Sequence, residues 1–431
     1  MKRSLLTAIL ALLGPAAALA AAPDPLAGHW VGTMTAHGAP LEVSFDFESD
    51  ASGLQGRFSS IPQRAMDYPL DSVTRDDGAV HFVLGGDLAF EARVAGDTLR
   101  GTFKGEELAG DVALRRGPKP VLPYRASEVT FRNGDATLAG MVASPPTPGR
   151  HPAVVLLHGS GPETRWGTNR FIADRFARAG IVTLIFDKRG TGASTGDWRT
   201  ADYQDLARDA LAGVALLRSL PEVDARRIGL HGHSQGGIIG PIAASMPGAE
   251  VAFLVAEDTA AGPTWKQDIY RVRNALASEF PPAEAERAMA LYTLFVEVAL
   301  GRRPHSELEA ASAPVAGERW FQWLGIPPRD SWIWTWYPKT GSVDTLDFWR
   351  KVKCPVLLVY GQRDRLVPVD ESIEQIEAAL DDSGASYTAW IAPRAEHNLT
   401  VRPQPGEPFF WWHAAPGIIE SVGAWILTAE R

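Results

Sequence analysis

A serine flanked by glycines is the feature of this chain most able to do chemistry. Residues 232–236 read Gly-His-Ser-Gln-Gly, with Ser234 at the centre, between an apolar run and a stretch of small residues. When a strand turns sharply into a helix, a serine on the turn is held in a strained conformation, and glycines two positions away let the flanking elements pass closely. The turn also presents the hydroxyl at a helix N-terminus, where backbone dipoles favour an oxyanion. The motif therefore predicts that Ser234 is a nucleophile.

Two residues later in the chain have the types and the order that a serine nucleophile needs. A hydroxyl attacks efficiently when an imidazole takes its proton, and the imidazole needs a carboxylate to fix its tautomer. On this kind of turn the expected chain order is serine, acid, histidine. Asp364 and His397 each follow an apolar, strand-like run, so both are expected at the carboxyl edge of one sheet. We predict a catalytic triad of Ser234, Asp364 and His397 that works through an acyl-enzyme, with Asp258 as the rival acid.

An oxyanion needs two backbone N–H donors, and the sequence offers candidates for both. One is Gln235, directly after the serine. The second is expected in residues 158–162, His-Gly-Ser-Gly-Pro, a loop that also follows an apolar run. A His-Gly loop at that place commonly supplies such a donor. Ser160 is the preferred candidate, and Gly159 is the next.

No metal or cofactor is expected. His158, His231 and His233 each belong to a turn whose shape explains them, and no carboxylate stands at ligand spacing beside them in the sequence. Cys354 is the only cysteine, which rules out an intramolecular disulfide and a multi-cysteine metal site. The loop 187–196 carries glycines after a strand-like run, but their spacing does not fit a dinucleotide-binding loop. That loop is expected instead to shape the rim of the serine site.

Alternating apolar runs and helical stretches must position these residues. The runs are apolar on both faces, as in a sheet that helices cover on both sides; they are residues 153–157, 181–186, 227–231, 251–256, 356–360 and 387–391. A hairpin is expected around Asn133-Gly134, and residues 203–217 carry an apolar stripe with helical spacing. Residues 127–431 are therefore predicted to form a doubly wound α/β sheet domain.

Residues 21–116 have a different pattern. Short runs in which apolar and polar residues alternate are bounded by Gly, Asp and Asn, which is typical of antiparallel strands and turns. We predict a small antiparallel all-β domain, a sheet or barrel that its own side chains fill. Residues 117–126 are rich in proline and predict a stiff linker. Because every predicted catalytic residue lies beyond this linker, removal of the β-domain is expected to leave the chemistry intact.

The segment 262–353 interrupts the α/β pattern. It shows helical patterns, and six of the 14 tryptophans fall between Trp320 and Trp349, among them Trp332, Trp334 and Trp336. A connection of this length carries its own structure, and a functional lid is a common reason for one. Aromatic side chains supply large apolar area with little entropy to lose, so these three tryptophans are expected to contact substrate as part of a lid. The alternative is that they fill the core of the insertion itself.

Composition and the N-terminus bear on partners and location. The chain has 431 residues, 45% of them apolar, and a net charge of −9, which argues against nucleic acid as a partner. Residues 1–20 combine Lys2 and Arg3, a short apolar run and a small-residue cleavage site. This pattern predicts a signal peptide, and hence an exported, periplasmic or secreted protein without an integral membrane segment after cleavage. The oligomeric state is left open.

From about Ser127 onward the chain resembles the α/β-hydrolase superfamily, and most of all exported serine carboxylesterases of the EstD type. The segments that carry the resemblance are 158–162, 187–192, 232–236, 352–357, 361–364 and 396–397. The resemblance implies hydrolysis of a small-molecule carboxylic ester without a cofactor, and a β-rich domain ahead of the catalytic one. The same motifs occur in serine peptidases of the superfamily. An exported aminopeptidase or dipeptidyl-peptidase-like hydrolase and a thioesterase therefore stay open, as does a binding module without catalysis.

Overall fold

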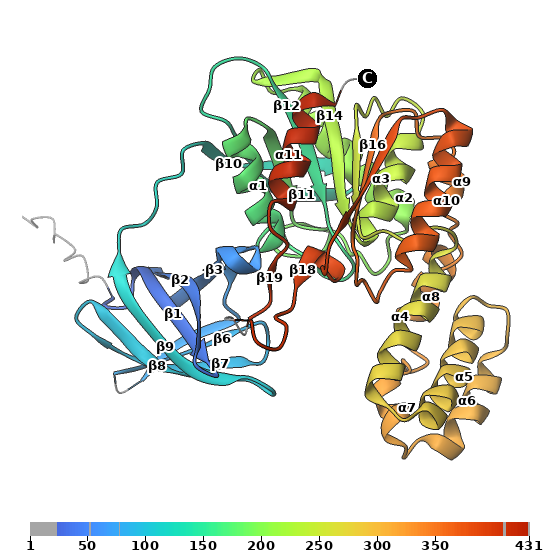
Figure 1. Cartoon of the computed structure of the whole chain (residues 1–431), viewed down its shortest axis with the longest axis horizontal. Coiled ribbons are helices and arrows are strands. Elements are labelled where there is room, and N and C mark those ends of the chain that lie inside the picture. Colours follow the sequence, from blue (N-terminus) through green and yellow to red (C-terminus); the bar gives the residue numbers. More distant parts are fainter. Residues whose placement is uncertain (1–23, 51–52, 77, 408–410, 430–431) are drawn as a thin grey trace, which may run out of the picture.

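The structure, a computed structural model, describes residues 24–50, 53–76, 78–407 and 411–429. The predicted signal peptide, residues 1–20, lies outside these ranges. The described residues form a β-domain, an α/β domain and a helical insertion within the α/β domain (Figure 1). No helix among them is both long and apolar enough to cross a membrane.

The β-domain is one curved, wholly antiparallel sheet. Its strand order is β4-β3-β2-β1-β9-β8-β7-β6-β5, and the bounds are β1 Gly28–Ala36, β2 Ala39–Asp50, β3 Gly53–Ser60, β4 Ala65–Pro69, β5 Ser72–Asp76, β6 Ala79–Leu84, β7 Leu88–Ala95, β8 Thr98–Lys104 and β9 Ala109–Gly117. A short 3-10 helix, Ile61–Gln63, joins β3 to β4. Phe45, Phe82 and Phe90 pack ring against ring at the centre, with centroids 4.4–5.7 Å apart. The concave side is therefore filled by the domain's own side chains.

The α/β domain contains an eight-stranded sheet in the order β10-β11-β13-β12-β14-β15-β16-β17. The strands are β10 Arg125–Asn133, β11 Ala136–Ser144, β12 His151–Leu157, β13 Val182–Phe186, β14 Val223–His233, β15 Leu254–Glu257, β16 Val356–Gly361 and β17 Tyr387–Ala392. β10 and β11 pair antiparallel at one edge, and from β13 to β17 neighbouring strands run parallel. This arrangement confirms the predicted fold class.

Helices cover both faces of this sheet. One apolar core packs against α1 and α11, and the other packs against α2, α3 and α10. The bounds are α1 Thr168–Ala179, α2 Tyr203–Arg218, α3 Gln235–Ser245, α10 Val369–Ser383 and α11 Ile418–Thr428. The strand runs are apolar on both faces because each face is buried by one of these layers.

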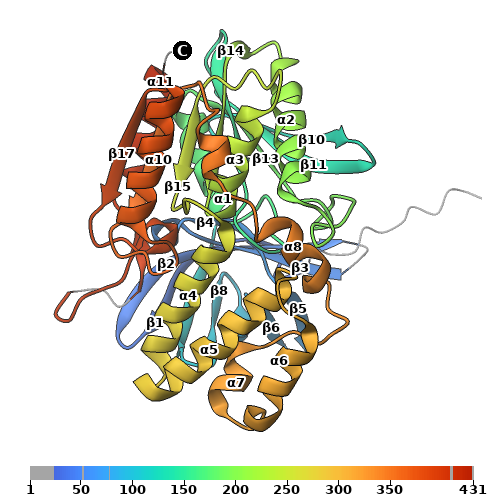
Figure 2. The ribbon, with the colours of Figure 1, turned by 90° about the vertical axis from the view of Figure 1, so that its right-hand side faces the viewer.

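The helical insertion connects β15 to β16 and forms a lobe of its own (Figure 2). It consists of α4 Thr264–Glu279, α5 Pro282–Ala299, α6 His305–Ser312, a 3-10 turn Ala313–Val315, α7 Arg319–Leu324, α8 Ile333–Thr340 and α9 Leu346–Trp349. Phe295 and Trp320 are among the buried side chains of its separate core. A bridge between Pro263 and Asp344 closes the base of the lobe.

The β-domain and the helical insertion both extend from the same side of the α/β domain (Figure 1). The β-domain is joined to α1 by a pair of backbone hydrogen bonds between Met66 and Gly167, 2.9 and 3.3 Å long. Beside them, Asp67 accepts a hydrogen bond from Arg170, at 2.9 Å. These contacts fix the β-domain against the edge of the sheet where the predicted site residues lie.

Candidate active site

Ser234 lies on the turn between β14 and α3, in a backbone conformation with φ 53° and ψ −114°. A non-glycine residue rarely adopts such a φ, and strain of this kind marks functional turns. The Ser234 N–H donates to the Glu257 carbonyl at 2.8 Å, which ties the turn to β15. A Cβ at Gly232 would lie 2.1 Å from the Gly236 carbonyl oxygen, and one at Gly236 would lie 2.6 Å from that of Leu157. Both glycines are therefore required by the close packing that the motif predicted.

Asp364 and His397 meet beyond the carboxyl ends of β16 and β17. His397 follows β17 and begins a short 3-10 turn, His397–Leu399, and its Nδ1 lies 2.7 Å from Asp364 Oδ2. The other carboxylate oxygen accepts the backbone N–H groups of Leu366 and Val367, at 2.7 and 3.0 Å. Because Nδ1 is engaged, Nε2 is the ring nitrogen available for proton transfer. Ser234 and His397 line the same cavity, which has a volume of about 430 Å³.

The surroundings of His397 favour its protonated form. Burial alone lowers the pKa of this imidazole, but the hydrogen bond and the charge of Asp364, with the charges of Asp258 and Glu257, outweigh burial. The pKa of His397 is therefore raised above its ordinary value. An imidazole held by a carboxylate in this way is suited to accept a proton and then return it.

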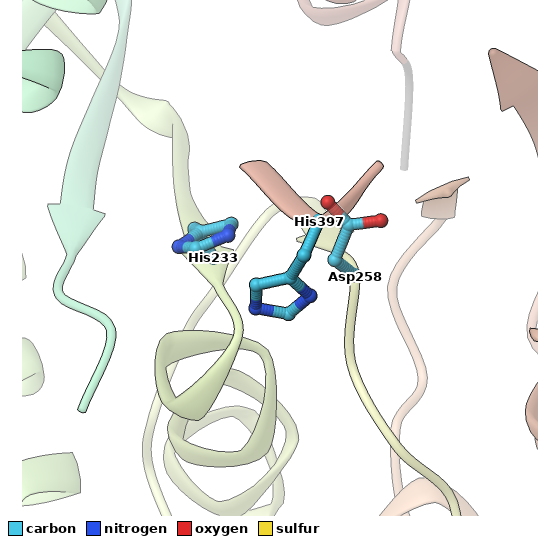
Figure 3. A group of neighbouring side chains, drawn as sticks. All are labelled: His233, Asp258 and His397. Carbon is cyan, nitrogen blue, oxygen red and sulfur yellow. The ribbon is translucent and has the colours of Figure 1, made fainter. Parts of the chain in front are cut away.

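Asp258 lies directly after β15 and also faces the histidine. Its Oδ1 accepts the Gly361 N–H at 2.8 Å, while its buried Oδ2 has no hydrogen-bond partner among the described residues. Burial raises the pKa of this carboxyl to about 7, although the charge of His397 opposes the shift. In Figure 3, His397 lies between His233 and Asp258, and one ligand atom of each lies within 4.8 Å of the others. These three residues are distant in the chain and only the fold brings them together, so the sequence does not predict this grouping.

The three side chains are of types that bind metals, but their environment gives two of them other roles. His397 is held through Nδ1 by Asp364. Burial, and after it the charge of His397, lowers the pKa of His233 to about 3, so His233 is a neutral imidazole at neutral pH. The direct hydrogen bond to His397 comes from Asp364 and not from Asp258, which makes Asp364 the better placed acid.

The loop that follows β12 borders the cavity with both predicted oxyanion residues, Gly159 and Ser160. The Gly159 N–H already donates to Glu163 Oε2 at 3.1 Å, so this amide is engaged. Ser160 and Gln235 both line the cavity beside Ser234, with Gln235 at the start of α3. Ser160 therefore stays the predicted second donor.

Lys188 holds this loop in place, and sequence reasoning missed it. Its Nζ donates to the carbonyl oxygens of Gly159 and Gly161, at 2.5 and 2.8 Å, and to Gln235 Oε1 at 3.1 Å. Burial lowers the pKa of Lys188 to about 8, with the charge of Glu163 acting against the shift. Its place in the loop 187–196, two residues after β13, is the local signal that points to the rim of the site. Its partners come from two distant loops.

A second missed residue, Arg64, comes from the β-domain. It is only 3% exposed, and its Nη1 donates to the carbonyl of Asn398, the residue after His397, at 2.8 Å. Its Nη2 lies 3.6 Å from Glu257 Oε2. Burial raises the pKa of Glu257, but His231 and Arg64 outweigh it and lower the pKa to about 2. The expectation that the β-domain can be removed without effect on the chemistry rested on the three triad residues alone and overlooked this contact.

The predicted lid tryptophans occupy three different environments. Trp336 lines the cavity together with Tyr203 and other residues. Trp334 packs against Phe295, with ring centroids 5.4 Å apart, and is partly buried against the core of the insertion. Trp332 packs against Trp198 in the loop before α2, at 5.0 Å. The structure thus places one of the three tryptophans at the cavity and the other two away from it.

The opposite wall of the cavity is polar. Asp268 of α4 accepts hydrogen bonds from the hydroxyls of Tyr292 and Tyr337, at 2.7 and 3.0 Å, and from Arg271 at 2.6 Å. Asp268, Arg271 and Tyr337 all line the cavity. The site therefore combines a strained serine, a histidine–carboxylate pair and a mixed polar and aromatic wall supplied by the insertion.

Comparison with known proteins places this geometry in a family. The model of the alpha/beta hydrolase family matches residues 154–409, more than half of the chain. That range includes Ser234, Asp364 and His397. Among solved structures, an esterase from Pyrococcus furiosus, Pf2001, is 22% identical with a TM-score of 0.43, over 64% of this chain and 84% of that one.

Curated relatives match shorter or more divergent parts of the chain. The quorum-quenching protein AidA of Acinetobacter baumannii is 32% identical over 117 residues, 27% of this chain and 38% of that protein. Esterase EstD of Thermotoga maritima is 29% identical over 144 residues, 31% of this chain and 34% of that protein. A 2-hydroxy-6-oxononadienedioate/2-hydroxy-6-oxononatrienedioate hydrolase of Burkholderia vietnamiensis is 27% identical over 280 residues, 61% and 83% of the two chains. The matches thus span little more than a third of the first two relatives.

Proposed function

The chain belongs to the alpha/beta hydrolase family, and from that premise we propose that it is a serine carboxylesterase with Ser234, His397 and Asp364 as its triad. The observation that carries the proposal is the 2.7 Å contact between His397 Nδ1 and Asp364, beside a cavity that Ser234 also lines. The same cavity supports a small-molecule ester as the substrate. The esterase EstD among the relatives is consistent with this proposal.

The proposed reaction proceeds in two halves. Ser234 Oγ attacks the ester carbonyl while His397 Nε2 takes the hydroxyl proton, and His397 then returns that proton to the leaving alcohol. The Gln235 and Ser160 amides hold the oxyanion of the tetrahedral intermediate. Water, activated by the same imidazole, hydrolyses the acyl-enzyme. The Ser234 hydroxyl has no hydrogen bond to a described residue, so it is free to rotate onto His397 when substrate binds.

A peptidase is less well supported than an esterase. A peptidase that holds a substrate amine needs free acidic groups at the cavity, and the sequence offered the adjacent pair Glu257 and Asp258. Both are fully buried and neither lines the cavity. Two other acids do line the cavity, but both are engaged: Asp268 by Arg271 and two tyrosines, and Glu163 by the Gly159 N–H. Glu257 is moreover engaged by Arg64 and His231. A thioester would use the same machinery as an ester, so a thioesterase remains the second candidate.

The test compares three substrates on one preparation. A nitrophenyl ester, an acyl thioester and an aminoacyl anilide are each assayed with wild-type protein and with Ser234→Ala. We expect the ester to be cleaved fastest and all turnover to depend on Ser234. Faster cleavage of the anilide would replace the esterase by a peptidase, and ester turnover that survives in Ser234→Ala would reject the triad. Export to the periplasm or the medium, inferred from residues 1–20, is part of this proposal and is tested by fractionation.

A further inference from the structure

A second cavity lies between the β-domain and the α/β domain. Its volume is about 630 Å³, within the range of roughly 300–1,000 Å³ typical of small-molecule sites. It shares four lining residues with the cavity that contains Ser234: Gly159, Glu163, His233 and Asn398. Gly159 and Glu163 belong to the loop that follows β12. His233 precedes Ser234 in the chain, and Asn398 follows His397. The two cavities therefore adjoin each other at the proposed catalytic residues.

The walls of this second cavity carry apolar and aromatic side chains from both domains. The β-domain contributes Phe58, Tyr68 and Leu84, and the α/β domain contributes Trp166, Ile172 and Trp412. Tyr68 and Trp412 are 41% and 44% exposed, and exposed aromatic side chains grouped in one cavity are a mark of a binding site. An aromatic wall of this kind suits an alkyl or aryl group, because it supplies apolar area with few rotatable bonds.

The wall from the β-domain is a fixed part of the site. Arg64 also lines the cavity and is buried against Asn398 and Glu257. The Met66–Gly167 backbone pair and the Asp67–Arg170 ion pair lie on the same segment as Tyr68. Because Arg64, Met66 and Asp67, just before Tyr68 in the chain, are all held against the α/β domain, the wall that carries Tyr68 is fixed in place. Phe58 also belongs to the phenylalanine-rich core of the β-domain, so the cavity borders that core.

We propose that the cavity between the two domains is a second substrate subsite, which binds an apolar alkyl or aryl group of the ester. The inference rests on the proposed function and extends it. The proposed substrates are esters with one long or bulky apolar group. Esters whose acyl and alcohol groups are both small, such as methyl acetate, are expected to be poor substrates. The β-domain then determines substrate choice through Tyr68 and Leu84. The apolar group can belong to the acyl or the alcohol part of the ester, and the experiment separates these two sources.

The experiment measures kcat/KM for two ester series with wild-type protein, Tyr68→Ala, Tyr68→Phe and Trp412→Ala. One series extends the acyl group from nitrophenyl acetate to nitrophenyl octanoate, and the other extends the alcohol from methyl to octyl acetate. In at least one series, Tyr68→Ala and Trp412→Ala should lower the ratio of long to short ester about tenfold, the effect of one lost apolar contact. Tyr68→Phe, which keeps the ring, should retain most of the wild-type ratio. Val31→Ala, which removes an exposed apolar side chain elsewhere on the β-domain, is the matched control.

The outcomes separate this inference from the function on which it rests. A change confined to the acyl series assigns the subsite to the acyl group, and a change confined to the alcohol series assigns it to the alcohol. If wild-type protein cleaves the esters but both alanine variants keep the wild-type ratio in both series, the subsite is rejected and the esterase stands. If wild-type protein cleaves no ester, the proposed function fails first. Melting temperatures identify a variant that does not fold. If one of the two alanine variants fails to fold, the ester ratio of the other decides whether the subsite exists.

Discussion

The β-domain and the helical insertion flank the same site but contribute to it in different ways. The insertion leaves the sheet after β15, beside Asp258, and the chain re-enters the sheet at the start of the parallel strand β16, at the opposite edge. It packs around its own core and gives the cavity a wall that includes Trp336 and Asp268. The β-domain is far from the triad in the chain, yet it buries Arg64 against the residue that follows His397. Each region thus binds the residue that follows a proposed catalytic one. The β-domain does so with the buried Arg64, and the insertion does so through an exposed pair of hydrogen bonds between Asn274 of α4 and Arg365, the residue after Asp364.

Of the changes that bear on this comparison, the largest effect is expected at the acid of the triad, which belongs to neither region. Asp364→Asn should lower kcat roughly 10⁴-fold, because the amide no longer holds His397 in the tautomer that accepts the serine proton. Asp258→Asn serves as the matched control and should cost far less, since Asp258 makes no direct hydrogen bond to His397. Steady-state kinetics on one nitrophenyl ester measure both. A larger loss of kcat in Asp258→Asn than in Asp364→Asn would identify Asp258 as the acid of the triad.

Arg64→Ala tests the contribution of the β-domain. It leaves Glu257 buried without its cationic partner, which typically costs about 3–5 kcal/mol of stability for a buried pair. It also frees the Asn398 carbonyl beside His397, so kcat should fall even under conditions where the protein is folded. Urea unfolding and ester kinetics measure the two effects. Arg100→Ala, at an exposed arginine of β8, is the control. Wild-type values for both quantities would show that the domain contact is incidental.

Trp336→Ala and Trp334→Ala test the helical insertion. Trp336 lines the cavity, so its loss should change the preference between short and longer esters about tenfold. Trp334 packs within the insertion, so its loss should lower the melting temperature and leave the preference as it was. Equal shifts in preference from both variants would contradict the assignment of Trp336 to the cavity and of Trp334 to the packing of the insertion.

The smallest effect concerns pH. The neutral form of His397 is the base, and its pKa lies above the ordinary 6.5, so kcat/KM should fall as the pH drops below that raised pKa. The charge of Asp258 contributes to the shift, and Asp258 itself has a pKa of about 7. Because removal of this charge lowers the pKa of His397, Asp258→Asn should move the acid limb of the profile to lower pH. A move to higher pH would contradict the assigned sign.

The sequence was informative where a local motif dictates the geometry. The turn at Ser234 follows from glycines that no larger residue can replace, and Asp364 and His397 follow strand ends that any parallel sheet brings to one edge. The fold class followed from runs of apolar residues with the right lengths. These inferences need no knowledge of distant contacts.

The rest depended on packing between remote segments. Nothing near Arg64 in the chain indicates that it reaches Asn398, and Lys188 finds its partners on two other loops. Trp332, Trp334 and Trp336 are close together in the chain, and the sequence predicts the same role in a lid for all three. In a helix, a step of two residues turns the side chain by about 200°, so Trp334 and Trp336 of α8 point in nearly opposite directions.

The central claim is that Ser234 forms an acyl-enzyme, and intact-mass spectrometry with a fluorophosphonate probe tests it most directly. Wild-type protein should gain one covalent adduct, which peptide mapping locates on Ser234, and labelling should abolish ester hydrolysis. Ser234→Ala should take up no label and lose on the order of 10⁶-fold in turnover, because a triad acts as a unit. An adduct on another residue, or activity of Ser234→Ala within tenfold of the wild type, would contradict the account.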